Sequence, residues 1–253
     1  MQKKLFNGLV LMFCLTCVGF GSTSFIRNHV TLDPVSNETA PVAMDSSIYT
    51  LYDSLNLQKL GLTKKAYLYA IQGCAKLKNR GEVKNGDIIS IIDFSLPSST
   101  KRLFIIDLKK GEMLFHTYVA HGRNSGKAMA SDFSNQPESF KSSLGFYVTS
   151  ETYSGKHGYA LRLKGEEKGI NDNAFNRGIV MHSAEYVSES TIKSLGFLGR
   201  SQGCPAVPAQ LHEAIIKKIK NGTCLFMYSP VKYYSQASNF LKEMPLADDS
   251  TSA

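Results

Sequence analysis

Two residues of this sequence have side chains that together could form and break a covalent acyl bond. His182 ends an apolar run, and Cys204 follows 22 positions later in the stretch Ser201-Gln202-Gly203-Cys204. A thiol is a weak nucleophile until it loses its proton, and a nearby imidazole can accept that proton and stabilise the thiolate. The pair therefore predicts nucleophilic catalysis, with Cys204 as the nucleophile and His182 as the general base.

The residues around Cys204 predict a tight loop that could stabilise an oxyanion. Gly203 allows the backbone to turn sharply, which would leave the amides near Gln202, Gly203 and Cys204 facing a developing negative charge. Ser201 is expected either to order this loop through a side-chain hydrogen bond or to be an ordinary turn serine.

The order of the two residues narrows the class of cysteine enzyme. Papain-like peptidases place the cysteine before the histidine, the reverse of the order here. Sortases share the order found here but need an arginine after the cysteine, and no arginine follows Arg200. The six histidines offer no HxxxD or HxH-like spacing that a metal hydrolase would need. No metal and no other cofactor is therefore expected.

The N-terminus has the pattern of an export signal. Lys3 and Lys4 precede an apolar stretch over residues 5–20, and small residues follow it. At about 16 residues the stretch is shorter than the roughly 20 that a spanning helix needs, although an uncleaved anchor is the alternative. The sequence thus predicts a signal peptide over residues 1–21 and a protein exported to the periplasm or cell envelope.

Cysteine content and charge fit such a compartment. Removal of the signal leaves Cys74, Cys204 and Cys224, an odd number, so at least one thiol is free unless another chain pairs with it. Cys74 and Cys224 lie in apolar segments and are expected to be buried as small hydrophobes or bridged to each other. The net charge of +8, or +6 without Lys3 and Lys4, suits an anionic polymer such as peptidoglycan. No basic stripe with interleaved aromatic residues indicates nucleic-acid binding.

Hydrophobic periodicity predicts an α+β chain that is mainly β. A flexible linker over residues 22–45 leads into a helical N-terminal element over 46–87, and a C-terminal tail over 231–253 follows the main domain over 88–230. Within that domain we expect a long polar loop over 121–143. The strands are expected at 88–94, 103–108, 113–120, 144–151, 159–163, 178–182 and 223–228, with one helix at 207–220.

Together these features resemble the catalytic domain of the murein L,D-transpeptidases (YkuD-like), in the branch whose motif ends Ser-x-Gly-Cys-Pro-Ala-Val. His182 and the stretch from Ser201 to Val207 carry the signature. The resemblance extends over roughly residues 46–230. Upstream segments that share it are 92–98, 102–107, 119–126, 143–147 and 155–159.

The resemblance implies a β-sandwich or mixed-sheet domain with a helical N-terminal element and one C-terminal helix. It also implies that Cys204 attacks the carbonyl of the third residue of a peptidoglycan stem tetrapeptide and expels D-Ala. An amine of a neighbouring stem would then resolve the thioester as a 3→3 cross-link, whereas water would make the enzyme an L,D-carboxypeptidase. A different class, an inactive peptidoglycan-binding module, remains an alternative. Stem peptides are the expected partners of a protein that is soluble after signal removal, with no nucleic acid and no metal.

Two departures from the better-known branch concern substrate recognition. That branch usually has histidine where Gln202 stands, and arginine or asparagine where Ala206 stands. The substrate carboxylate therefore lacks an assigned partner, and Arg200, Arg123 and Arg177 are the candidates. Further residues that could border the cleft and bind substrate are Ser183, His121, His157 and Tyr147.

Overall fold

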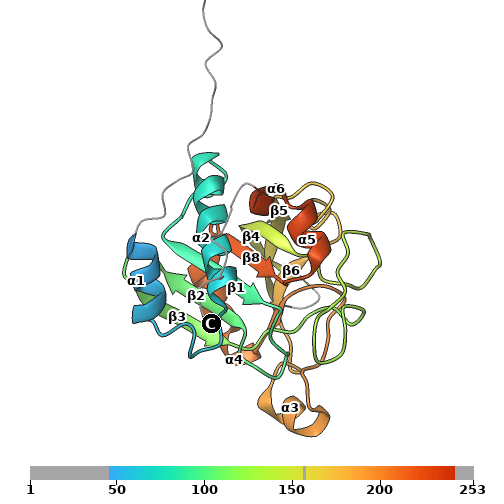
Figure 1. Cartoon of the computed structure of the whole chain (residues 1–253). Helices are drawn as coiled ribbons and strands as arrows, with labels where there is room; N and C mark the ends of the chain where they lie inside the picture. Colours follow the sequence, from blue (N-terminus) through green and yellow to red (C-terminus); the bar gives the residue numbers. More distant parts are fainter. Residues whose placement is uncertain (1–45, 156–157, 243–253) are drawn as a thin grey trace, which may run out of the picture. The chain divides into compact units, whose positions relative to one another are not determined.

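The computed structural model describes residues 46–155 and 158–242, and both ranges belong to one structural unit. The predicted signal and linker lie outside the described residues. Eight strands form a sheet in the order β3-β2-β1-β8-β4-β5-β6-β7 (Figure 1). These strands are β1 (Ile88–Asp93), β2 (Leu103–Asp107), β3 (Glu112–Thr117), β4 (Gly145–Gly155), β5 (Gly158–Gly165), β6 (Val180–Ser183), β7 (Ala206–Val207) and β8 (Cys224–Tyr228).

The sheet mixes parallel and antiparallel pairs. β1 pairs in parallel with β8, and β6 pairs in parallel with β7, while the other neighbours are antiparallel. β8 is buried along its whole length and β1 nearly so. Both strands read as continuous apolar runs, as expected for parallel strands whose two faces are covered.

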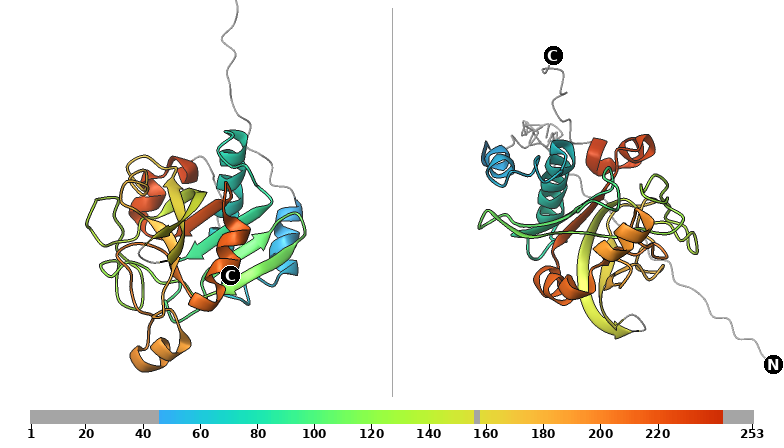
Figure 2. Two further views of the ribbon diagram at one scale, coloured as in Figure 1. Left: turned by 180° about the vertical axis from the view of Figure 1, so that it is seen from behind. Right: turned by 90° about the horizontal axis from the view of Figure 1, so that it is seen from below.

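Helices cover both faces of this sheet. α1 (Ser46–Ser54), α2 (Lys64–Asn79), α5 (Lys232–Ala237) and α6 (Asn239–Lys242) lie on one face (Figure 2). α4 (Ala209–Ile219) lies on the other, between β7 and β8 in the chain. α3 (Glu189–Leu195) has no buried residue and lies at the edge of the domain.

α2 joins the N-terminal helical element to the core of the sheet. A Cβ added at Gly73 would lie 2.0 Å from the ring of Phe146 in β4, so only glycine allows this close approach. The Phe146 ring stacks on Phe226 of β8, with centroids 4.2 Å apart, and contacts Phe240 of α6 at 4.9 Å. Helices from both ends of the described chain therefore share one aromatic core with the sheet.

The predicted α+β, mainly β fold is confirmed, and most predicted strands match to within a few residues. Four elements were not expected: α3, the two-residue β7, and the helices α5 and α6, which fall where a C-terminal tail was predicted. The tail segment is anchored by Tyr234, whose hydroxyl donates to Glu167 at 2.9 Å. α5 and α6 are too short to show a helical period in the sequence, and they depend on such tertiary contacts.

Cys74 in α2 and Cys224 in β8 are 3% and 0% exposed, and both carry free thiols. Interaction between the two thiols lowers the pKa of Cys74 and raises the pKa of Cys224. The expectation of burial is confirmed, and no bridge joins the two sulfur atoms. Cys204 is the half-exposed thiol among the residues described.

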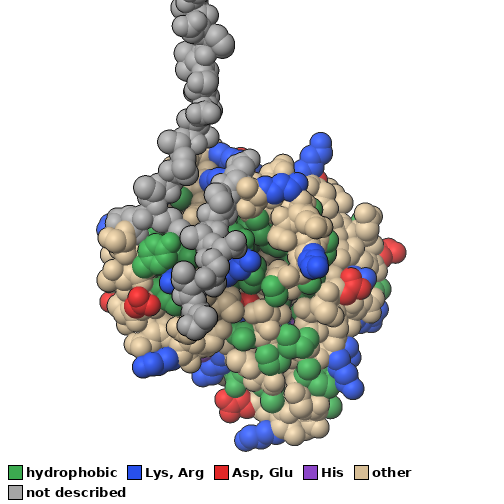
Figure 3. All heavy atoms as spheres, viewed as in Figure 1, with side chains coloured by type: hydrophobic (Ala, Val, Ile, Leu, Met, Phe, Trp, Pro, Cys, Tyr) green, Lys and Arg blue, Asp and Glu red, His purple; other side chains and the backbone are tan. Residues whose placement is uncertain are grey.

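Charged side chains are spread over the surface. Figure 3 shows Lys and Arg scattered across the face in view, with acidic side chains between them, and not gathered into a stripe. Among residues 46–155 and 158–242, no helix has the length and apolar character that crossing a membrane requires.

Candidate functional site

Cys204 and His182 line the same cavity, which has a volume of about 490 Å³. Its walls come from the long loop between β3 and β4, from β4, from the segment entering β6, and from residues 200–205, here called the Cys204 loop. Other side chains that line it include Arg123, Glu138, Phe140, Arg177, Tyr186 and Arg200.

Strand β6 brings the sulfur and the imidazole to one place. His182 pairs in register with Ala206 of β7, two residues after Cys204. The Cys204 sulfur accepts a hydrogen bond from the Val180 amide at 3.5 Å and donates to the Gly178 carbonyl at 3.7 Å. Residues two apart in a strand have side chains on the same face. These two hydrogen bonds place the sulfur beside β6, the strand that presents His182 to the cavity.

The ring of His182 has a defined tautomer. Its Nδ1 atom lies 2.8 Å from the carbonyl oxygen of Ser183. A carbonyl oxygen can only accept a hydrogen bond, so Nδ1 carries the proton and donates it. In the neutral ring the lone pair is then on Nε2, the atom able to take a proton from a thiol. The side chain is 7% exposed, which limits its movement.

The bend in the Cys204 loop requires glycine. Gly203 has φ of +122°, and a Cβ there would lie 2.7 Å from the carbonyl oxygen of Lys141. The Ser201 hydroxyl donates to the Cys204 carbonyl at 2.6 Å and accepts from the Gly203 amide at 3.0 Å, so it orders the loop. The Gly203 amide is thus already used. The amides of Gln202 and Cys204 donate no hydrogen bond to any residue that the structure describes.

The long loop supports the Cys204 loop through its backbone. Ala120 pairs with Ala206, and Gly122 pairs with Ser201. The Ser201 amide donates to the carbonyl of His121 at 2.9 Å. The predicted loop over residues 121–143 contains no helix and no strand. It is nonetheless built into the wall of the cavity.

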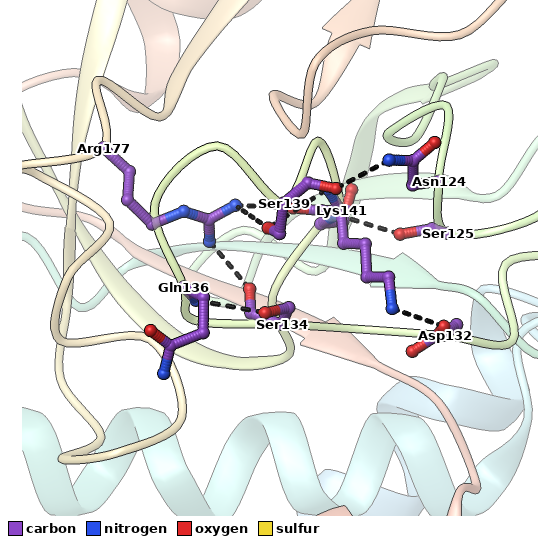
Figure 4. Close-up of polar contacts among 9 residues, drawn as sticks. Asn124, Ser125, Asp132, Ser134, Gln136, Ser139, Lys141 and Arg177 are labelled. Carbon is purple, nitrogen blue, oxygen red and sulfur yellow. Dashed lines mark hydrogen bonds and ion pairs between the residues drawn. The ribbon is translucent and has the colours of Figure 1, made fainter.

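Arg177 holds the part of the long loop from Ser134 to Lys141 in place through hydrogen bonds (Figure 4). Burial lowers the pKa of this guanidinium, and its positive charge offsets part of the rise that burial causes in the pKa of Cys204. Its terminal nitrogens donate four hydrogen bonds of 2.7 to 3.3 Å, to the carbonyls of Ser134 and Lys141 and to the hydroxyls of Ser139 and Ser143.

His121 lies behind the cavity and does not line it. It is fully buried, with Nδ1 2.6 Å from Nη2 of Arg102 and Nε2 3.3 Å from the carbonyl oxygen of Gly126. A guanidinium only donates, so Nδ1 accepts and Nε2 carries the proton. Burial, and then the charge of Arg102, lower the pKa of His121 to about 3. The ring is therefore neutral, and it holds the long loop in place.

The other predicted substrate-binding residues divide into two groups. Arg123 and Arg200 line the cavity. Tyr147 is buried with its hydroxyl bonded to Ser143, and the side chain of Ser183 does not line the cavity, although its carbonyl orients His182. His157 lies outside the described residues.

Several lining residues were missed from the sequence, namely Glu138, Phe140, Tyr153 and Tyr186. The length of the polar loop was a signal for the first two, but which of its side chains face inward depends on how it folds. Within the described residues no group of three His, Cys, Asp or Glu side chains could hold a metal ion.

The thiol of Cys204 is expected to be protonated at neutral pH. Burial raises its pKa, and the Val180 amide and Arg177 only partly offset this effect. Its alkylation by iodoacetamide, followed by mass spectrometry between pH 6 and 10, should therefore rise with a midpoint above the ordinary value for a cysteine. Cys204→Ala serves as the control for reaction at the buried thiols. A midpoint below pH 7 would instead indicate a resting thiolate–imidazolium pair.

The sequence matches the L,D-transpeptidase catalytic domain family over residues 58–228. No curated protein matches it. Solved structures similar to it include an L,D-transpeptidase from Mycobacterium smegmatis, at 12% identity and a TM-score of 0.36, covering 56% of this chain and 59% of that chain.

Two further structures show a similar degree of likeness. L,D-transpeptidase 3 from Mycobacterium tuberculosis, in complex with a faropenem-derived adduct, has 13% identity and a TM-score of 0.37, covering 56% of this chain and 60% of that chain. The helical cell shape determining protein from Campylobacter jejuni has 13% identity and a TM-score of 0.40, covering 65% and 57%. The chain thus spans less than two thirds of each of these structures.

The family match covers more than half of the chain. It begins before α2, includes the whole eight-stranded sheet, and contains both residues of the cavity that could carry acyl chemistry. This protein therefore belongs to the family of L,D-transpeptidase catalytic domains.

Proposed function

We propose that the protein is a peptidoglycan L,D-transpeptidase of the periplasm or cell envelope, with Cys204 as its nucleophile and His182 as its general acid and base. One observation carries the proposal: both side chains line one cavity, and the sulfur is hydrogen-bonded to β6 two residues before His182. Family membership supports the class of reaction. The export signal predicted from the sequence supports the location.

Acylation begins with transfer of the thiol proton to Nε2 of His182. The Cys204 sulfur attacks the carbonyl carbon of the third residue of a stem tetrapeptide. Because burial keeps the pKa of the thiol high, the base must act in the same step. The Gln202 and Cys204 amides are the donors available to the oxyanion. Collapse of the tetrahedral intermediate expels D-Ala as an amine, which takes the proton from His182.

The resulting thioester is then exchanged for a new amide. A side-chain amine of a neighbouring stem gives its proton to His182 and attacks the thioester carbon. The Cys204 sulfur leaves and regains a proton. One amide is broken and one is formed, so the reaction balances without an oxidant or reductant. Water in place of the amine would give a tripeptide, the product of an L,D-carboxypeptidase.

Incubation with purified tetrapeptide muropeptides tests the proposal, with products analysed by mass spectrometry. We expect cross-linked dimers that have lost one D-Ala per cross-link. Cys204→Ala should form none, whereas Cys74→Ala, which removes a thiol outside the cavity, should still form them. Tripeptide without dimers would make the protein an L,D-carboxypeptidase.

A second assay separates an enzyme from a binding module. A carbapenem should add its mass to the wild-type protein and not to Cys204→Ala, because its strained carbonyl acylates an activated thiol. Neither product nor adduct from the wild type under reducing conditions would contradict the proposal and favour a peptidoglycan-binding module.

A further inference from the structure

Three arginines, Arg123, Arg177 and Arg200, line the cavity, against one acidic residue, Glu138. Three positive charges and one negative charge leave the lining net positive by two, which favours an anionic ligand. Each guanidinium has five N–H donors in one plane. The arginine that binds the ligand must be one whose donors the protein itself does not already use.

Two of the three already donate hydrogen bonds to the protein, Arg177 from both terminal nitrogens and Arg200 from one. Arg177 donates four hydrogen bonds to the long loop, and moving it would release that wall of the cavity. Nη1 of Arg200 donates to the carbonyls of Arg123 and Gly126, at 3.3 and 3.2 Å. Its guanidinium also lies over the ring of Phe197, 5.7 Å from the centroid. Both side chains therefore hold backbone in place.

Arg123 is different. Its guanidinium makes no hydrogen bond and no ion pair with any of the described residues, and it lies over the ring of Phe140 at 4.0 Å from the centroid. Stacking uses the face of the guanidinium and leaves its N–H groups, which point outward in the plane, able to bind. The side chain is exposed in the cavity and oriented before any ligand arrives.

The backbone of Arg123 is fixed beside the sulfur-bearing loop. Its amide donates to the Ser201 carbonyl at 2.8 Å, and a Cβ on the preceding Gly122 would lie 2.9 Å from the Cα of Gly203. In a donor tetrapeptide, the terminal carboxyl carbon lies one residue beyond the attacked carbonyl carbon, which is at most ~3.6 Å in an extended chain. A long side chain that starts from this position can reach that carboxylate.

We propose that Arg123 binds the terminal carboxylate of the donor peptide and so selects donors with a free C-terminus. The inference rests on the proposed function, and it says which residue of the same cavity determines its specificity for the donor peptide. A guanidinium binds a carboxylate through two parallel hydrogen bonds, which a lysine ammonium cannot reproduce. The role of Arg123 is therefore recognition of the donor, separate from the proton transfers at Cys204 and His182.

Two donor peptides that differ only at the terminus test this role: one ends in D-alanine and the other in D-alanine amide. Release of the terminal residue gives kcat/KM for each. The wild type should prefer the free acid by about tenfold to a hundredfold, as expected for a charged hydrogen bond. In Arg123→Gln the preference should collapse toward one, through loss on the acid donor alone, and Arg123→Lys should retain part of it.

Two control variants complete the design. Lys217→Gln removes a positive charge from the surface of α4 and should leave the preference unchanged. Thermal unfolding of each variant checks that the fold is intact, and Arg123→Lys provides a charged variant if the glutamine form unfolds. Arg200→Gln tests the alternative that Arg200, and not Arg123, binds the terminal carboxylate.

The outcomes distinguish the two proposals. If the wild type releases D-alanine but Arg123→Gln keeps the acid preference, the assignment of Arg123 is overturned and the proposed function stands. Loss of the preference in Arg200→Gln alone would transfer the role to Arg200 and likewise overturn it. If the wild type releases nothing from either donor, the proposed function fails, and the assignment of Arg123 fails with it.

Discussion

Replacing His182 with glutamine is expected to slow acylation of Cys204 by about 10²- to 10⁴-fold, the usual contribution of a general base. Glutamine can form hydrogen bonds but cannot take the thiol proton at neutral pH. Because burial raises the pKa of Cys204, little thiolate exists without a base. The rate of adduct formation with a carbapenem, measured by mass spectrometry at pH 7, gives the effect directly.

The pH dependence of this variant provides a further check. Hydroxide can form the thiolate without an imidazole, so the gap between His182→Gln and the wild type should narrow as the pH is raised. His212→Gln is the matched control, because this buried histidine of α4 bonds the carbonyl of Tyr159 and does not line the cavity. Acylation of His182→Gln at close to the wild-type rate at pH 7 would show that another group is the base.

The stability of the fold is expected to fall as the pH is lowered through the range below 6.5, because of His121. Burial and Arg102 lower the pKa of this histidine to about 3 in the folded protein, against an ordinary value of 6.5. Between these two values the unfolded chain binds a proton that the folded chain does not. The free energy of unfolding should therefore drop by about 1.4 kcal/mol per pH unit, or roughly 4 kcal/mol between pH 6.5 and 3.5.

Urea unfolding at several pH values measures this slope. His121→Asn retains a hydrogen-bond acceptor for Arg102 but cannot be protonated, so its unfolding free energy should depend less on pH than that of the wild type. Comparing the two cancels the contribution of the carboxylates. His116→Asn is the control, since burial lowers the pKa of that half-buried histidine as well, and its smaller desolvation should change the slope less. Equal slopes for the wild type and His121→Asn would show that His121 is protonated in the folded state.

Much of the fold could be predicted from short segments of sequence. The apolar runs of β1 and β8 and the stripe of α4 are local patterns, and each predicted element is present with small shifts at its ends. α3, α5 and α6 have no such pattern. α3 buries no residue, while α5 and α6 are held by contacts such as the hydrogen bond from Tyr234 to Glu167, residues that lie far apart in the chain.

The sequence by itself determined which side chains could carry acyl chemistry and where a glycine bend was needed, because thiol and imidazole reactivity and backbone freedom are properties of single residues and their immediate neighbours. Only the tertiary structure decided how the charged groups are used. Arg177 donates hydrogen bonds to carbonyls of the long loop, which are distant in sequence, and this fixes Arg177 in the wall of the cavity. Arg102 donates to His121, so that the histidine is a neutral support of the loop. Among the described residues the guanidinium of Arg123 makes no hydrogen bond or ion pair and stacks on the face of Phe140, which leaves its N–H groups able to bind a ligand. A sequence shows which donors exist, but which of them stay unused depends on acceptors that folding brings to them.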